Sequence, residues 1–280
     1  MEQAEIDNLS IKRMIESNHP FFIGRIAGIE LKVAYYVSKG DKQAYTQELE
    51  GLENNAGIHV HDNDSVLAYT TQLVEAYTNC TVIAEWERSG QVFAYHGMGQ
   101  ELISERTPTI PKIDALALEP YYYKDSWMSA LKGKRILIVH PFVDTIQKQI
   151  EKRSVLFPGR SWFEECEIQC ISPPLTLAGN HQGKDWQEHY ASFLSELQKV
   201  NDFDIALVAA GGYGMLLSNY IFTTTKKSVI YVGGALQLFF GIIGKRWFDN
   251  KRILSMVQEE WVRPSEKPKN SIRVEKGCYW

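Results

Sequence analysis

The second half of the chain alternates between short, continuously apolar runs and longer segments with helical spacing. Three of the apolar runs are "RILIV" (135–139), "IALVAA" (205–210) and "SVIYV" (228–232). A strand that is apolar at every position is buried on both faces, which is typical of a parallel sheet covered by helices. Segments 144–157 and 185–200 have the helical pattern expected between such strands, and Asp185 with Glu188 forms a cap pair of the Asp-x-x-Glu type at the start of the second. The alternation predicts an α/β, Rossmann-like fold with a mostly parallel sheet flanked by helices.

The first half of the chain is predicted to be rich in helices. Its expected helices cover 7–18, 29–38, a segment that begins after Asp41, and 65–79, and its expected strands cover 21–23 and 81–86. Gly40 suits the C-cap of one helix and Asp41 the N-cap of the next. Segment 97–125 is rich in proline, holds "YYY" and is predicted to be an irregular connector. We therefore expect one α/β domain over 1–280, with a possible internal boundary near 97–125.

Composition narrows the classes of function. The chain has 280 residues, of which 44% are hydrophobic, and its net charge of -4 does not suit a non-specific nucleic-acid binder. The longest apolar stretch, 229–244, is shorter than a membrane span, and the acidic start does not resemble a signal peptide. The four cysteines show no zinc-like spacing and are expected to be free thiols. These features predict a soluble, cytoplasmic protein without a transmembrane segment or a nucleic-acid partner.

Ligands of open parallel sheets bind beyond the carboxyl ends of the strands, so the residues that follow each strand are the candidate site residues. Five predicted strands are followed by small or polar residues: Gly24, Arg25 and Glu30 after the first; His140, Asp144 and Thr145 after the second; Ser172, Asn180 and His181 after the third; Gly211, Gly212, Tyr213 and Gly214 after the fourth; and Gly233, Gly234 and Gln237 after the fifth. The fold would bring these residues to one edge of the sheet.

Several of these candidates have two interpretations. The glycines of 211–214 would let backbone N–H groups approach a phosphate, but a tight strand-to-helix turn also uses glycine. His140 is either a hydrogen-bonded histidine at a strand end or a ligand contact. Arg246 follows an apolar run and either marks a helix end whose charge reaches solvent or forms a second anion contact. Arg25 and Glu30 form either an internal ion pair or part of a site, because buried charges are rare unless paired or used.

The segment "IGRIAGIEL" (23–31) resembles the Arg-x-Gly-Asp-Gly-Glu stretch of GT-D-type glycosyltransferases. The segments "LKGKRILIV" and "DFDIALVAAGGYG" and the strand after them occur in the same order in that family, so the resemblance covers roughly 23–247. The segments "GGALQLFFGIIGKRW" and "EEWVRP" resemble a subgroup of bacterial and viral surface-polysaccharide proteins.

The resemblance implies a Rossmann-like fold, a nucleotide-sugar donor and a divalent metal held by an Asp-x-Glu motif. The family arginine falls on Arg25, which would contact the diphosphate. The family glutamate falls on Glu30, which would act as general base or metal ligand. The family aspartate falls on Gly28. A manganese or magnesium ion would then need other ligands beside Glu30, such as Asp144 or the pair Asp62 and Asp64. Otherwise Arg25, the glycine turn and Arg246 would neutralise the diphosphate without a metal.

The function that the resemblance implies is transfer of a sugar to a glycan or lipid-linked acceptor during polysaccharide biosynthesis. The protein would act in the cytoplasm, peripheral at the membrane if its acceptor is lipid-linked. Two alternatives remain open at this stage. One is another polysaccharide-modifying transferase, and the other is a catalytically silent protein that binds a nucleotide or a glycan, which the glycine at position 28 favours.

Overall fold

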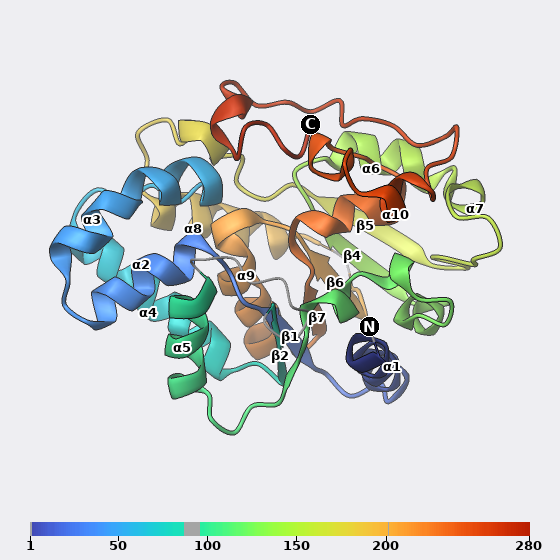
Figure 1. Cartoon of the computed structure of the whole chain (residues 1–280), viewed down its shortest axis with the longest axis horizontal. Helices are drawn as coiled ribbons and strands as arrows, with labels where there is room; N and C mark the ends of the chain where they lie inside the picture. The colour runs from blue at the N-terminus through green and yellow to red at the C-terminus, as the bar shows by residue number, and fades with distance from the viewer. Residues whose placement is uncertain (1, 87–95, 201) are drawn as a thin grey trace.

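A computed structural model describes residues 2–86, 96–200 and 202–280, and it confirms the predicted α/β, Rossmann-like fold (Figure 1). A single parallel sheet of 7 strands has the order β3-β2-β1-β7-β6-β4-β5. The strands are β1 (Phe22–Arg25), β2 (Val82–Glu85), β3 (Lys112–Asp114), β4 (Arg135–Val139), β5 (Glu167–Ile171), β6 (Ile205–Val208) and β7 (Ser228–Tyr231). The two halves of the chain share this sheet because β1 pairs with both β2 and β7.

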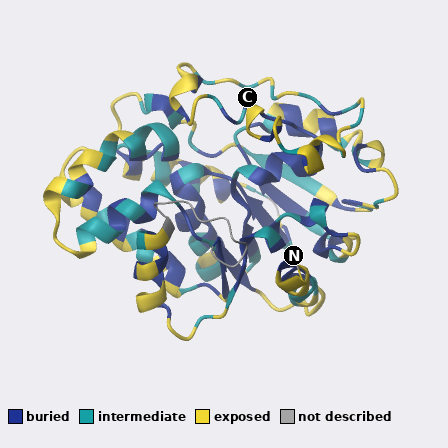
Figure 2. Ribbon diagram, in the orientation of Figure 1, coloured by how far each residue is buried: buried dark blue, intermediate teal, exposed yellow. Residues whose placement is uncertain are grey.

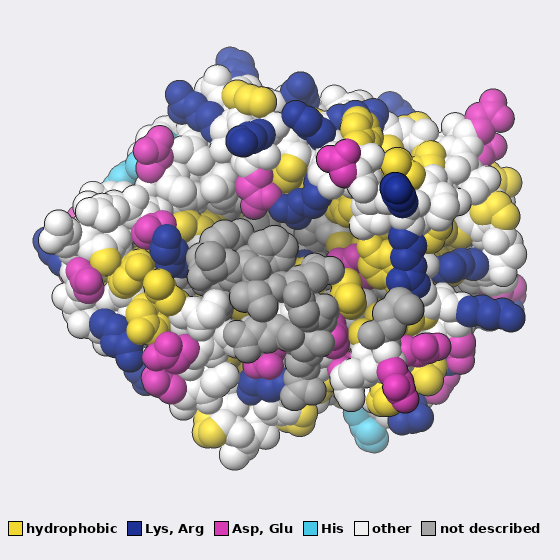
Figure 3. Space-filling model, viewed as in Figure 1, with side chains coloured by type: hydrophobic (Ala, Val, Ile, Leu, Met, Phe, Trp, Pro, Cys, Tyr) yellow, Lys and Arg dark blue, Asp and Glu magenta, His cyan; other side chains and the backbone are white. Residues whose placement is uncertain are grey.

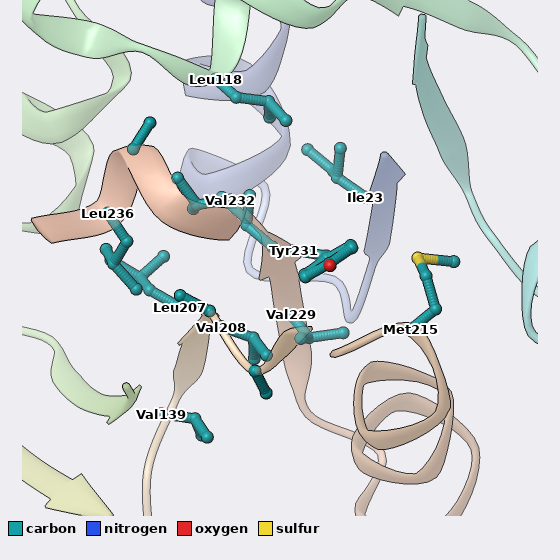
Figure 4. Packing of buried hydrophobic residues seen from close by; sticks show 14 of the residues in the cluster. Ile23, Leu118, Val139, Leu207, Val208, Met215, Val229, Tyr231, Val232 and Leu236 are labelled. Atoms are coloured by element: carbon teal, nitrogen blue, oxygen red, sulfur yellow. The ribbon is translucent and has the colours of Figure 1, made fainter. Parts of the chain in front are cut away.

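Helices surround the sheet and separate its strands along the chain. The α-helices are α1 (Glu2–Glu16), α2 (Ile29–Ser38), α3 (Lys42–Gly51), α4 (Asn63–Thr78), α5 (His96–Arg106), α6 (Val143–Ile150), α7 (Arg153–Leu156), α8 (Trp186–Leu197), α9 (Gly214–Tyr220) and α10 (Lys251–Leu254). The central strands are buried, as their predicted apolar pattern requires (Figure 2). Figure 4 shows Ile23, Leu207 and Val229 of β1, β6 and β7 packed among Met215 of α9, Leu118 and Leu236.

Local capping signals account for several helix boundaries. Helix α2 has the predicted bounds, and Gly40 follows it with a φ of 70°. The side chain of Asp41 accepts a hydrogen bond from Ala44 N at 3.0 Å and so caps α3. The Asp185 side chain and Glu188 form the predicted capping box at the start of α8. These boundaries were readable in the sequence because a cap is a contact between residues two or three positions apart.

The prediction of an irregular connector over 97–125 was wrong in part. This segment contains most of α5 and all of β3, followed by short 3₁₀ turns. Strand β3 pairs in parallel with β2, so its three residues extend the edge of the sheet. So short a run carries no strand signal of its own, because its pairing is provided by a neighbour distant in sequence.

The C-terminal segment (255–280), which follows α10, folds back along the carboxyl edge of the sheet. Figure 1 shows it at the top of the view. Ile242 pairs with Val262 in an isolated bridge, and the Trp280 indole donates a hydrogen bond to Glu266 O at 2.7 Å. All four cysteines are free thiols, as predicted. Within the described parts of the chain, no helix is both long and apolar enough to cross a membrane.

Candidate functional site

A cleft of about 680 Å³ lies at the carboxyl edge of the sheet. Residues from the ends of five strands line it: Arg25 after β1, Trp86 after β2, His140 after β4, Gly211 after β6 and Gly233 after β7. The chain visits β5 and then β6 on opposite sides of β4, and such a reversal opens a crevice at the strand ends. Figure 3 shows this face of the molecule, where Lys and Arg side chains gather over the C-terminal segment at the top of the view.

Arg25 ends β1 and lies in the wall of this cleft. Its Nη1 donates a hydrogen bond to Val232 O at 2.8 Å, and its guanidinium lies 4.9 Å from the centre of the Trp86 ring. Among the described residues Arg25 forms no direct ion pair with Glu30, although its charge lowers the pKa of that carboxyl group. The buried Nε–H of Arg25 has no hydrogen-bond partner among the described residues. An unpaired buried donor costs about 1–3 kcal/mol, so an acceptor oxygen of a ligand would be stabilised there.

Gly233 makes room for this guanidinium. Its φ is 74°, and a Cβ atom at this position would lie 2.8 Å from Nη1 of Arg25. Both the positive φ and the close approach favour glycine. The structure therefore brings together two residues, 25 and 233, that the sequence analysis predicted from separate strand ends.

Glu30 lies in the first turn of α2, which begins after Gly28, and both residues line the cleft. The side chain is largely buried, with 8% of the residue exposed. Burial raises the pKa of Glu30, and hydrogen bonding to its own backbone and the charge of Arg25 oppose that rise only in part. A carboxylate with a raised pKa accepts a proton more readily near neutral pH, which is the property of a general base.

His140 follows β4 and is 2% exposed. Its Nδ1 accepts a hydrogen bond from Phe142 N at 3.0 Å, which assigns the ring proton of the neutral form to Nε2. Burial lowers the pKa of His140 to about 3, although the charge of Glu266 opposes the shift. The imidazole is therefore neutral at physiological pH and can offer the cleft an uncharged N–H donor.

The glycine turn after β6 contributes one of its four predicted residues to the cleft lining, Gly211. Gly212 accepts a hydrogen bond from the Tyr69 hydroxyl at 2.9 Å, and a Cβ on Gly214 would overlap the Tyr231 ring. Tyr213 is buried. These three residues hold the turn in place behind the cleft wall.

Three further predicted residues, Gly234, Gln237 and Arg246, also line the cleft and contact the C-terminal segment. A Cβ on Gly234 would overlap the Tyr279 ring, and the Gln237 amide donates to Tyr279 O at 3.3 Å. Arg246 donates hydrogen bonds to the Tyr279 hydroxyl at 3.2 Å and to the Glu275 carboxylate. The C-terminal segment thus completes one side of the site.

Other predicted residues lie outside the described lining of the cleft. Thr145 is buried at the start of α6, where its backbone N–H donates to Glu266 Oε1 at 2.9 Å. Asp144 beside it is exposed. Asp62 caps α4 by accepting from Ser65 N at 2.9 Å, and Asp64 is exposed in the first turn of that helix.

The sequence analysis missed several cleft residues, among them Glu119, Tyr122, Glu275 and Tyr279. Glu119 accepts a hydrogen bond from the Tyr121 hydroxyl. Burial raises the pKa of Glu119, and this hydrogen bond and the charges of Arg25 and Arg246 oppose the rise. Both arginines therefore act on one half-buried carboxylate of the cleft. No strand precedes these residues directly, so the rule that ligands bind beyond the carboxyl ends of strands did not predict them.

The cleft carboxylates do not form a ligand set for a divalent ion. A group of three His, Cys, Asp or Glu side chains close enough to share an ion occurs once in the described residues, at Glu53, His59 and His181. None of these three residues lines the cleft. Within the described parts of the chain, Glu30 is not joined by two further carboxylates or imidazoles, so these residues do not fit the metal centre that the resemblance to GT-D-type enzymes implies.

The chain was compared with known proteins at three levels, and no protein-family model, curated protein or solved structure matches it.

Proposed function

We propose that this protein is a glycosyltransferase that moves a sugar from a nucleotide-sugar donor to a glycan or lipid-linked acceptor. The main observation in support is Arg25, whose guanidinium lies at the carboxyl edge of a parallel sheet and whose buried Nε–H has no hydrogen-bond partner among the described residues. An anionic ligand with acceptor oxygens, such as a diphosphate, satisfies both the charge and the free donor. The carboxyl edge of such a sheet is also where nucleotides bind in this fold class.

The two cleft arginines would neutralise the leaving diphosphate. The charges of Arg25 and Arg246 both act on Glu119 and on Tyr279, which indicates that the two guanidinium groups serve the same part of the cleft. One well-placed donor in a site without water contributes about 3 kcal/mol of transition-state stabilisation. Two arginine charges and the uncharged N–H donor of His140 would therefore stabilise the diphosphate without a metal ion.

Glu30 would act as the general base. In a direct displacement the acceptor oxygen attacks the anomeric carbon, and Glu30 takes the proton of that hydroxyl. The bond between the anomeric carbon and the phosphate oxygen breaks, and the nucleoside diphosphate leaves with the electron pair. Burial supports this role, because it raises the pKa of Glu30 toward the pH at which a base works best. The reaction would take place in the cytoplasm, at the membrane surface when the acceptor is lipid-linked.

Binding of nucleoside diphosphates tests the first step of this proposal. We expect the melting temperature of the protein to rise with UDP, GDP, ADP or CDP, and Arg25→Gln to abolish that rise. Arg13→Gln is the matched control, because Arg13 is exposed on α1. Stabilisation that is equal in the wild-type protein and Arg25→Gln contradicts the proposal, as does the absence of stabilisation by every diphosphate.

A second candidate is a silent protein that binds a nucleotide or a glycan. The observation that favours it is Gly28, which lines the cleft where the resembling enzymes have an acidic residue. Turnover separates the two candidates. Slow hydrolysis of a nucleotide-sugar that Glu30→Gln removes supports the enzyme, whereas tight binding without hydrolysis or transfer supports the silent protein.

A further inference from the structure

Four of the seven histidines of the chain gather beside the cleft wall: His59, His61 and His181 on two loops, and His189 in α8. The rings of His59 and His181 are stacked with centroids 3.6 Å apart, and His59 lies edge-on to His61 at 5.1 Å. His189 joins the group through a hydrogen bond between its Nε2 and His181 O at 2.9 Å. The proposed transfer reaction uses none of these imidazoles.

A carboxylate joins the two stacked rings. Oε2 of Glu53 lies 2.9 Å from Nδ1 of His59, and Oε1 lies 3.5 Å from Nε2 of His181. The three ligand atoms lie within 4.8 Å of one another. We propose that Glu53, His59 and His181 bind a divalent transition-metal ion of the Zn²⁺ class, with solvent at the fourth position.

The donor set explains this choice of ion. Zn²⁺ binds imidazole nitrogen and carboxylate oxygen at about 2.0–2.2 Å in a tetrahedral arrangement, which places neighbouring ligand atoms roughly 3.3 Å apart. The distances from the Glu53 carboxylate to Nδ1 of His59, 2.9 Å, and to Nε2 of His181, 3.5 Å, lie on either side of that value. Mg²⁺ prefers oxygen ligands alone, so a site with two imidazoles discriminates against it.

Hydrogen bonds around the cluster hold its backbone in place. Trp186 N donates to His59 O at 2.8 Å, and the Asp185 carboxylate accepts from His61 N at 3.1 Å. These contacts fix the loop that carries His59 against the start of α8. Such surrounding contacts reduce the conformational freedom that an ion must otherwise restrict.

One ring must turn for the ion to bind. The stacked planes differ by 8°, so the in-plane lone pairs of His59 and His181 do not meet at one point. The Nδ1 of His181 also accepts from Gly183 N at 3.0 Å, which leaves the ring proton on Nε2. Rotation of His181 out of the stack breaks this bond, the proton of the neutral ring then moves to Nδ1, and the lone pair of Nε2 becomes available to the ion. The side chain of His181 is 18% exposed and lies on a loop, which gives it room for this rotation.

An ion at this position would join two segments of the cleft wall. Glu53 belongs to the π-helical turn η1 (Leu52–Ala56), in which Asn55 lines the cleft and accepts from Glu275 N at 3.3 Å. His181 follows the 3₁₀ turn η6 (Leu177–Gly179), in which Leu177 lines the same cleft. The proposed ion would therefore connect these two segments to each other, and the inference does not depend on the proposed transfer reaction.

Cobalt provides the most direct test, because tetrahedral Co²⁺ has strong visible absorption bands that hexa-aqua Co²⁺ lacks. The full-length protein is treated with a chelator, exchanged into buffer and titrated with Co²⁺, then with Zn²⁺. We expect one ion per chain, intense bands, and their loss as Zn²⁺ displaces Co²⁺. Glu53→Gln and His181→Asn should each weaken binding at least about 100-fold, whereas His19→Asn, at an exposed position, should bind as the wild-type protein does.

Two further measurements keep the test decisive if a variant folds poorly. Zn²⁺ should raise the melting temperature of the wild-type protein, and Mg²⁺ at the same concentration should not. Addition of Zn²⁺ should shift the ring NMR signals of His59 and His181 but not that of His19, which requires no variant in either loop. The absence of tetrahedral Co²⁺ bands overturns the proposal, as does equal binding by wild type and folded Glu53→Gln, or equal stabilisation by Mg²⁺.

Discussion

The guanidinium of Arg25 lies so close to Gly233 that a Cβ atom on the glycine would be 2.8 Å from Nη1. The adjacent residue, Val232, accepts the hydrogen bond from the same Nη1 at 2.8 Å. The end of β7 therefore holds the arginine at the end of β1, and the pairing of these two strands aligns the two ends. This relationship places the main cationic group of the cleft.

Replacement of Gly233 by alanine tests this relationship. We expect Gly233→Ala to displace the guanidinium and to weaken binding of nucleoside diphosphates at least about 10-fold, the loss of one hydrogen bond to a charged group. Gly40→Ala is the matched control, because Gly40 has a φ of 70° and an added Cβ would meet nothing within 4 Å. Both variants should lose about 1–2 kcal/mol of stability through backbone strain, measured by denaturant unfolding. Equal diphosphate affinity in the two variants contradicts the assigned role of Gly233.

Replacement of Glu30 by glutamine tests its proposed role as the general base. The amide keeps the shape of the side chain and removes the proton acceptor, so sugar transfer should fall about 10²–10⁴-fold while the circular dichroism spectrum stays unchanged. Initial rates with a nucleotide-sugar donor measure the effect. Turnover close to that of the wild-type protein would exclude Glu30 as the general base.

Glu30 also predicts a pH dependence of stability. Its pKa is raised by burial above the ordinary value of 4.5, so the folded state holds the proton more tightly than the unfolded state. Stability from this group is therefore present at low pH and is lost as pH rises through the folded pKa. Glu30→Gln should melt at a higher temperature than wild type at pH 8, and the difference should shrink toward pH 4.5. A difference that grows on acidification has the wrong sign for a buried carboxylate.

Burial of His140 is expected to give protein stability the opposite pH dependence. Burial lowers its pKa from 6.5 to about 3, so acid favours the unfolded state, which takes up the proton. The stability that this group contributes is lost as pH falls below about 6.5, and the loss of unfolding free energy reaches about 2 kcal/mol at pH 5. His140→Asn keeps an acceptor for Phe142 N and does not titrate, so its unfolding free energy should fall less between pH 6.5 and pH 5. Parallel curves for the two proteins would show that His140 is protonated normally.

Thr145 is expected to contribute to the stability of the fold rather than to catalysis. Its hydroxyl donates to the Glu266 carboxylate and accepts from Ser265 N at 3.0 Å, which attaches the C-terminal segment to α6. Thr145→Val should cost about 1–3 kcal/mol in denaturant unfolding and make this segment more sensitive to proteolysis. Thr46→Val is the control, because that hydroxyl is exposed and bonds within its own helix. A variant that unfolds like the control would remove this role.

The rate of transfer should not depend on Mg²⁺ or Mn²⁺. The cleft carboxylates that the structure describes do not form a group of three ligands, and two arginines act on the Glu119 carboxylate. Initial rates in the presence and absence of either ion measure this directly. The same assay in Glu53→Gln removes any contribution from the histidine cluster. Activity that a chelator abolishes and Mn²⁺ restores would assign Glu30 as a metal ligand instead.

Much of the candidate site followed from the rule that ligands bind at the ends of parallel strands. Arg25, His140, Gly211 and Gly233 each follow a predicted strand, and all of them line the cleft. Thr145 shows the limit of that rule, because a residue one turn into the following helix can point toward a different segment. Periodicity identifies a strand end but not the direction of each side chain beyond it.

The sequence by itself determined the α/β class, the capped helix starts at Asp41 and Asp185 and the strands that carry the candidate residues. These features depend on contacts between near neighbours and on alternation of burial, both of which a local pattern records. The tertiary structure alone decided that β7 lies beside β1, that Glu275 and Tyr279 complete the cleft, and that Glu53 meets His181. Such contacts join residues far apart in the chain, and their formation depends on the packing of the whole sheet and its covering helices.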